Sequence, residues 1–194
     1  LYPHPELLPV HWRGYDAVAA IVLQGVSLER LSASQFDALH KWTAQGGTLA
    51  VPGGADYALL RTARLAELLP AAPLGMMRMD AGALQGAFSA SLDVTQPVHV
   101  NRVGELRGEV RLRAGEVPLV IERSLGLGPV VYLTFDVAAY PFDRWEGMRA
   151  LWLDTLRLSA APSAASAGTA KPVVGNALAA LVRAEATPFP RYAT

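Results

Sequence analysis

The sequence predicts an α/β protein built on an open, mainly parallel sheet. Three features of the first third of the chain carry this prediction. Residues 17–26 form a near-continuous apolar run, typical of a strand covered on both faces. An amphipathic helical pattern follows, and residues 48–51 form a second short buried strand. Two buried strands joined by one helix make a βαβ unit, so we expect parallel strands and a right-handed crossover.

The helix between these strands has recognisable start and stop signals. Ser32 opens it, and Gln35 three residues later completes a capping-box pattern. Gly46 and Gly47 end it at the usual C-terminal glycine position. Its inner face is predicted to comprise Phe36, Leu39, Trp42 and Thr43.

The sequence also predicts the structure of the segments on either side of this unit. Residues 1–14 contain three prolines and are predicted to be an extended lead-in. After the second strand, residues 52–54 (PGG) turn the chain into a helix that begins near Asp56. The apolar side of that helix is predicted to comprise Leu59, Leu60, Ala63 and Leu68.

The second half of the chain adds further strands. Residues 76–94 have weak periodicity and predict no element. An added antiparallel β segment is expected over about residues 95–125, from strands at 98–103, 109–113 and 117–123. Residues 129–135 (PVVYLTF) are another buried strand. A helix over 143–158 follows, in which Trp145 and Trp152 share a face.

The domain organisation follows from these elements. Residues 1–158 form the α/β domain, 159–175 an Ala/Pro/Ser linker, and 176–194 a short C-terminal tail. Within the tail, residues 176–184 are predicted to be a short helix with an Asn cap. The first residues, Leu1-Tyr2-Pro3, lack a signal-peptide pattern, and we expect the chain to be part of a longer protein.

Composition narrows the functional classes. Of 194 residues, 52% are hydrophobic and 18% charged, which suits a compact protein. Lys plus Arg and Asp plus Glu both total 17, so the chain lacks the basic excess that is typical of nucleic-acid-binding proteins. The chain has no cysteine, which excludes disulfides, thiolate metal ligands and cysteine nucleophiles together.

Two stretches of this sequence resemble the class I glutamine amidotransferase-like superfamily. They are GYDAVAAIVLQGVSLERLSASQFDALHKWTAQGGTLAVPGG and PLVIERSLGLGPVVYLTFDVAAYPFDRW, and the resemblance covers roughly residues 10–158. It implies a flavodoxin-like open sheet. The chain is most similar to non-catalytic versions found in bacterial membrane-anchored proteins. That similarity implies a location outside the cytoplasmic membrane, periplasmic or at the cell surface, tethered to the inner membrane by segments outside this chain.

The family usually has a strand and a helix before the segment that begins at Tyr15, and this chain has no room for them. Either this sequence starts within the domain, or an earlier segment is removed by processing. In both cases we expect one edge or face of the sheet to be left open and covered by a neighbouring molecule.

The catalytic residues of the resembled family are missing. Its enzymes place a cysteine on a sharp strand-to-helix turn, whereas residues 52–56 (PGGAD) contain no Cys, Ser or Thr. Its histidine and glutamate follow a late strand, where this chain has Phe135-Asp136-Val137-Ala138. The resemblance therefore implies no glutaminase activity, and we predict no catalytic residue.

Candidate ligand-binding residues follow the predicted strands, at the carboxyl edge where open α/β sheets bind ligands. The backbone of Gly53 and Gly54 could bind an anion at a helix start, although a structural turn with Asp56 as the helix cap is the favoured interpretation. Ser27 is interpreted as a loop serine, since no nucleophile motif surrounds it. The full predicted set is Gln24, Gly25, Ser27, Gly53, Gly54, Asp56 and Asp136.

Two other kinds of chemistry have candidate residues in this chain. The four histidines lack metal-site spacing, so no metal or other cofactor is predicted (His4, His11, His40 and His99). Asp136 with Glu122, or with Asp143, could form a carboxylate pair for acid–base catalysis. In the favoured interpretation Asp136 tethers a loop and Asp143 caps the following helix.

Two functional hypotheses result. The first is a non-catalytic, extracytoplasmic interaction or ligand-binding domain of a membrane-anchored protein. The second is a hydrolase or transferase that uses carboxylates at the carboxyl edge. For the first, the expected partner is another protein or a neighbouring domain of the same protein, and a second copy of the chain is a candidate. No nucleic acid is expected.

Overall fold

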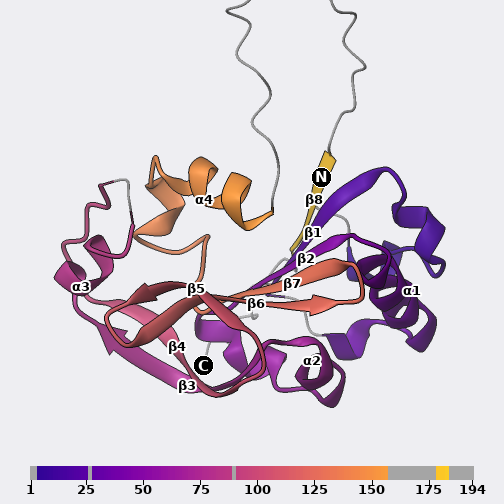
Figure 1. The fold of residues 1–194 in the computed structure, drawn as a ribbon, viewed down its shortest axis with the longest axis horizontal. Helices are drawn as coiled ribbons and strands as arrows, with labels where there is room; N and C mark the ends of the chain where they lie inside the picture. Colours follow the sequence, from indigo (N-terminus) through magenta and orange to yellow (C-terminus); the bar gives the residue numbers. More distant parts are fainter. Residues whose placement is uncertain (1–3, 26–27, 89–90, 157–177, 184–194) are drawn as a thin grey trace, which may run out of the picture.

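A computed structural model describes residues 4–25, 28–88, 91–156 and 178–183. Its strands form a six-stranded sheet, in the order β5-β6-β7-β2-β1-β8, and a separate two-stranded sheet of β3 and β4 (Figure 1). The strands are β1 (Val18–Gln24), β2 (Thr48–Pro52), β3 (Ala71–Met79), β4 (Val98–Leu106), β5 (Glu109–Ala114), β6 (Val117–Leu125), β7 (Gly128–Leu133) and β8 (Leu178–Arg183). The α-helices are α1 (Ala33–Ala44), α2 (Ala63–Leu68), α3 (Ala81–Gln85) and α4 (Met148–Thr155). Short 3-10 turns are η1 (Pro5–Leu7), η2 (Trp12–Tyr15), η3 (Leu28–Arg30), η4 (Ala55–Leu60) and η5 (Phe142–Arg144).

The six-stranded sheet is mixed. β1 pairs in parallel with β2 on one side and with β8 on the other, and β2 pairs in parallel with β7. β6 is antiparallel to both β7 and β5. The predicted α/β class and the parallel β1–α1–β2 unit are therefore confirmed.

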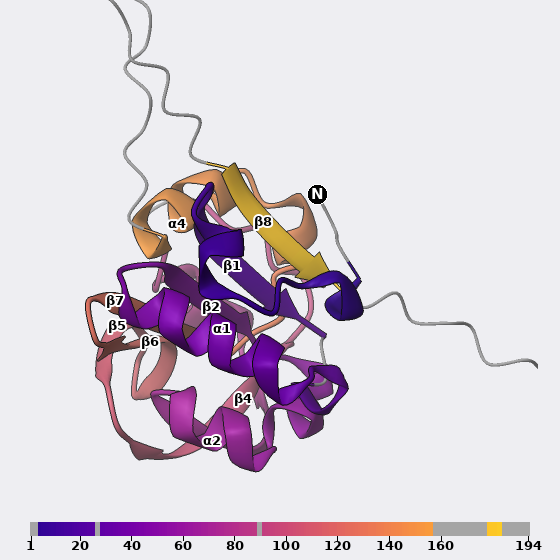
Figure 2. The same ribbon diagram turned by 90° about the vertical axis from the view of Figure 1, so that its right-hand side faces the viewer.

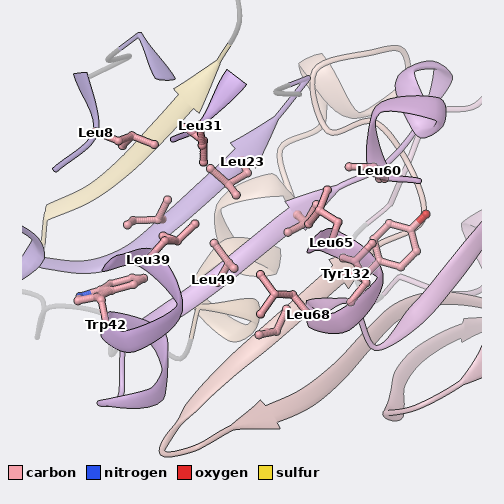
Figure 3. Packing of buried hydrophobic residues seen from close by; sticks show 14 of the residues in the cluster. Leu8, Leu23, Leu31, Leu39, Trp42, Leu49, Leu60, Leu65, Leu68 and Tyr132 are labelled. Carbon is pink, nitrogen blue, oxygen red and sulfur yellow. The ribbon is translucent and has the colours of Figure 1, made fainter. Parts of the chain in front are cut away.

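The core lies on both faces of this sheet, because successive side chains of its buried strands point to opposite faces. On one face, Ile21 and Leu49 pack under α1 and α2, as Figure 3 shows for the labelled leucines and Trp42. On the other face, Val22 and Ala50 belong to the cluster that includes residues of α3 and α4. Figure 2 shows α1 and α2 in front of the sheet, with α4 beyond it.

The predicted start of α1 is confirmed in detail. The Ser32 hydroxyl accepts a hydrogen bond from the Gln35 N–H at 3.2 Å, and Gln35 Oε1 accepts one from the Ser32 N–H at 2.9 Å. The Gln35 amide nitrogen also donates to the carbonyls of Glu6 and Leu8. Gln35 thus holds the N-terminal segment against α1. Because this segment forms the 3-10 turns η1 and η2, the expectation of an extended lead-in is wrong.

The capping box makes a testable contribution. We expect Ser32→Ala to lower the free energy of unfolding by about 1 kcal/mol, because an N–H at the helix start loses its acceptor. The matched control is Ser34→Ala, which alters an exposed serine inside the same helix and should change stability by less than about 0.5 kcal/mol. Urea unfolding monitored by circular dichroism measures both. Equal effects of the two variants would show that the box is not a stabilising feature.

Two predicted helices have different starts. The helix expected near Asp56 is divided into η4 and α2, and Thr62 caps α2 through its side chain, which accepts from the Leu65 N–H. Thr62 has the extended backbone of a capping residue, and its hydroxyl supplies an acceptor to an N–H that has none within the helix. Asp56 lies inside η4 and caps no helix. The helix expected over 143–158 begins only at Met148, and Asp143 is paired with Arg144 instead of capping it.

The added β segment is divided between the two sheets. β5 and β6 form an antiparallel hairpin within the main sheet, whereas β4 leaves it and pairs with β3. β3 begins at Ala71 and ends at Met79, so its last residues fall in the region 76–94, where the sequence predicts no element. The prediction of a single antiparallel unit over residues 95–125 is therefore wrong, because β4 pairs with β3 and not with β5 or β6.

The helix expected over residues 176–184 is wrong, because residues 178–183 form β8 beside β1. A nine-residue helix is marginal without tertiary contacts, whereas pairing with β1 satisfies backbone groups of both strands. Within the described residues, the edge expected to be open beside β1 is thus filled by this chain's own strand. The predicted linker at 159–175 lies outside the described residues.

Candidate functional site

The carboxyl ends of β1, β2 and β7 meet at one edge of the sheet, as their parallel pairing requires. Gln24 ends β1, and its side-chain amide donates a 2.7 Å hydrogen bond to Asp136 Oδ1, beyond β7. Gly25 follows with φ of +62°, and a Cβ built there would lie 3.5 Å from Asp56 Oδ2. The structure therefore brings Gln24, Gly25, Asp56 and Asp136 together, while Ser27 lies outside the described residues.

The glycine turn after β2 uses its own backbone donors internally. The Gly53 N–H donates to the Leu133 carbonyl at 2.7 Å, and the Gly54 N–H donates to Asn101 Oδ1 at 2.9 Å. The Asn101 amide nitrogen donates in return to the Gly54 carbonyl at 2.9 Å. Both N–H groups that could have bound an anion are occupied, so the geometry favours the structural interpretation of this turn.

The same turn has no space for side chains. Gly54 has φ of +106°, and a Cβ built there would lie 2.5 Å from the Cβ of Asp136. A Cβ at Gly53 would overlap Asn101 Oδ1. The position that carries the nucleophile in the resembled enzymes is therefore packed against neighbouring residues.

Asn101 is the central residue of this packing, and the sequence analysis did not single it out. Its side chain is fully buried, and Oδ1 also accepts a 2.9 Å hydrogen bond from the Tyr132 hydroxyl. Burial raises the pKa of that hydroxyl well above its ordinary value, so it donates as the neutral phenol. The sequence carries no clear signal for Asn101, because alternation with the apolar Val98 and Val100 predicts an outward-facing polar side chain at position 101.

Asp136 has the role of a loop tether, as predicted. Its Oδ1 accepts from the Ala138 N–H at 2.8 Å in addition to the Gln24 amide. Glu122, the other carboxylate of the acid–base hypothesis, lies on β6 opposite Val131 of β7 and bonds to Arg111 at 2.8 Å. Because Val131 is well before the end of β7, the structure does not bring Glu122 and Asp136 together.

No metal centre is visible in the part of the chain that the structure describes, where no group of three His, Asp or Glu side chains could hold an ion. The four histidines lie on separate segments, and His11 accepts a hydrogen bond from the Arg13 N–H at 3.3 Å.

Comparison with known proteins identifies only the fold. No protein-family model matches the chain, and no curated protein does. Among solved structures, the chain is similar to cytoplasmic protein STM3548 from Salmonella typhimurium, with a TM-score of 0.59 and 17% identity, over 79% of this chain and 76% of that one. Cytoplasmic protein STM1381 from Salmonella typhimurium LT2 gives 0.57 and 18%, with the same coverage. An exo-beta-1,4-mannosidase from Opitutaceae bacterium strain TAV5 gives 0.44 and 21%, over 74% of this chain and 25% of that one.

These neighbours correct one prediction. The resemblance implied an extracytoplasmic, membrane-tethered location, but two solved proteins of similar fold are named cytoplasmic proteins. The predicted location is therefore wrong. Within the described residues, no helix has both the length and the apolar character needed to cross a bilayer.

Proposed function

We propose that this chain is a non-catalytic binding domain of the class I glutamine amidotransferase-like type. The observation that carries the proposal is the glycine turn after β2. In an enzyme of this type the turn presents a nucleophile, and an adjacent backbone N–H helps to stabilise the oxyanion. Here Asn101 occupies the Gly54 N–H, and Asp136 fills the space that a side chain at Gly54 would need.

The order of elements supports the assignment of type. Four neighbouring strands, β8, β1, β2 and β7, are parallel, as in a flavodoxin-like open sheet, and β6 and β5 continue it as an antiparallel edge. The glycine turn follows β2, where the resembled family has its nucleophile.

The carboxyl edge is nevertheless suited to binding. Open α/β sheets bind ligands at this edge, and here it carries polar groups from three strand ends. Asp56 is exposed, and Asp136 is half-buried with one carboxylate oxygen engaged by Gln24 and Ala138. We therefore assign Gln24, Asp56 and Asp136 to the binding surface, with a protein partner as the expected ligand.

The experiment is a direct assay of hydrolysis. We expect the full chain to release no ammonia from glutamine and no p-nitrophenol from p-nitrophenyl acetate above the rate without protein, because the turn offers neither nucleophile nor oxyanion donor. Asp136→Asn should leave both rates unchanged.

The control for this assay is Glu146→Gln, which alters an exposed carboxylate in the same region. Turnover that Asp136→Asn abolishes and Glu146→Gln preserves would overturn the non-catalytic proposal and establish the carboxylate hydrolase instead.

A further inference from the structure

A hollow lies at the opposite edge of the sheet from the carboxyl-edge site. It has a volume of about 560 Å³, within the range of small ligand sites. Its lining residues are Arg107, Gly108, Glu109, Glu122, Arg123 and Ser124. Since β5 runs in the same direction as β7, this first part of β5 lies at the amino edge of the parallel strands.

The hollow contains an unpaired piece of strand edge. β6 extends past β5, because the first residue of β5, Glu109, is already opposite Glu122. Arg107, which would face Ser124 if β5 were longer, turns away and donates its N–H to the Pro70 carbonyl at 2.7 Å. β6 thus continues for three residues without a strand beside it on that side, within the described part of the chain.

The register shows which backbone groups are free. β6 and β7 are joined by a two-residue turn whose closing pair is Leu125 and Gly128. In such hairpins the closing pair is hydrogen-bonded, so the next residues, Ser124 and Pro129, form a pair that is not. The N–H and C=O of Ser124 therefore point away from β7 and into the hollow.

Two arginines are fixed beside this edge. Arg107 Nη1 donates to the Ala66 carbonyl and Arg123 Nη1 to the Glu67 carbonyl, each at 2.9 Å, in the last turn of α2. A guanidinium has five N–H donors, so each arginine keeps donors for a ligand while its position is set by α2. Glu105 lies 3.6 Å from Arg107 on the exposed side.

We propose that this hollow binds the C-terminal segment of a partner polypeptide as an added antiparallel strand. Its backbone would pair with Ser124, and its terminal carboxylate would bind Arg107 and Arg123. An antiparallel strand beside Ser124 runs in the direction of β5, so its last residue arrives at the corner formed by Arg107 and Gly108. The direction of the added strand therefore brings its terminal carboxylate to the place where the two arginines lie.

The local charges favour a single carboxylate over an acidic stretch. Glu122 is paired with Arg111 at 2.8 Å, whereas Glu109 also lines the hollow and would repel additional negative charge. A neutral, β-forming segment whose terminal carboxylate is its one negative charge can bind the two arginines and adds no further repulsion with Glu109. This proposal is independent of the carboxyl-edge site and of the hydrolysis assay.

The test compares two fluorescein-labelled hexapeptides, Thr-Val-Thr-Val-Thr-Val with a free C-terminus and the same peptide with a C-terminal amide. Fluorescence anisotropy against the full wild-type chain should show binding of the free acid and about tenfold weaker binding of the amide, because the amide lacks the charge-assisted bonds to arginine. Equal affinities, or no binding of either peptide, would overturn the proposal.

Variants then locate the site. Arg107→Gln should remove most of the difference between the two peptides. Ser124→Pro removes an outward-facing N–H and puts the proline ring in its place, so it should weaken both peptides about fivefold without removing a donor from the ladder to β7. The matched control, Arg113→Gln, alters an exposed arginine at the other end of β5 and should change neither affinity. Unchanged affinities in Arg107→Gln and Ser124→Pro would contradict this site even if the wild-type chain binds.

Discussion

Replacing Asn101 with leucine should lower the free energy of unfolding by about 3–5 kcal/mol, since several buried polar groups lose their partner at once. The Asn101 side chain is fully buried and bonds to both the N–H and the C=O of Gly54 and to the Tyr132 hydroxyl. Leucine has the same number of side-chain heavy atoms but no polar atom, so the loss reports the missing hydrogen bonds together with the strain of fitting two larger methyl groups, and no cavity.

Urea unfolding of the wild-type and variant chains measures this loss. The control is His99→Leu, which makes an apolar substitution at an exposed position of the same strand and should change stability by about 0.5 kcal/mol or less. Tyr132→Phe removes only the hydroxyl bond and should cost about 1 kcal/mol.

A double-mutant cycle between Asn101 and Tyr132 isolates their shared hydrogen bond. If Asn101→Leu is as stable as His99→Leu, Asn101 does not hold the glycine turn, and the packing argument for a closed turn fails with it.

The second large effect is expected from Gly54→Ala, which should cost about 3 kcal/mol or more through backbone strain and overpacking combined. Gly54 has φ of +106° and ψ of −148°, a conformation that L-residues rarely adopt. The added Cβ would also lie 2.5 Å from the Cβ of Asp136, so β2 or the loop after β7 would have to move.

Gly82→Ala is the matched control, because a Cβ at that helical position meets nothing within 4 Å. It should stabilise the chain by up to about 1 kcal/mol, as alanine favours helix. Differential scanning calorimetry of both variants makes the comparison. A stable, fully folded Gly54→Ala chain would show that this turn can accept a side chain, and the proposal of a closed turn would lose its main support.

The elements that the sequence predicts well are those that local interactions decide. The apolar run of β1 and the capping box at Ser32 need only neighbouring residues, and both are confirmed. The same holds for the polar groups at strand ends, since parallel strands place their carboxyl ends together. Gln24 and Asp136 could therefore be predicted as neighbours, although their hydrogen bond could not.

The elements that the sequence misses depend on distant partners. Asn101 lies two residues after the exposed His99, so alternation predicts that it faces outward, and its burial against Gly54 could not be predicted. The helix predicted from residue 143 starts late because the Phe142 ring stacks on Phe135, with ring centroids 4.2 Å apart, and Phe142 forms part of η5. The strand β3 is half exposed along its length, so its alternation is too weak to recognise without β4.

The place of β8 has a consequence for folding during synthesis. β1 is translated long before β8, its partner on one side, because Ile21 pairs with Ala180. Contacts between residues so far apart in the sequence form slowly, because the long chain between them must be ordered before they can be made. The nascent domain therefore passes through a period in which α1, β2 and β7 can assemble while one side of β1 is unpaired. That exposed edge is where we expect a chaperone, or a faulty encounter with a second nascent chain, to act.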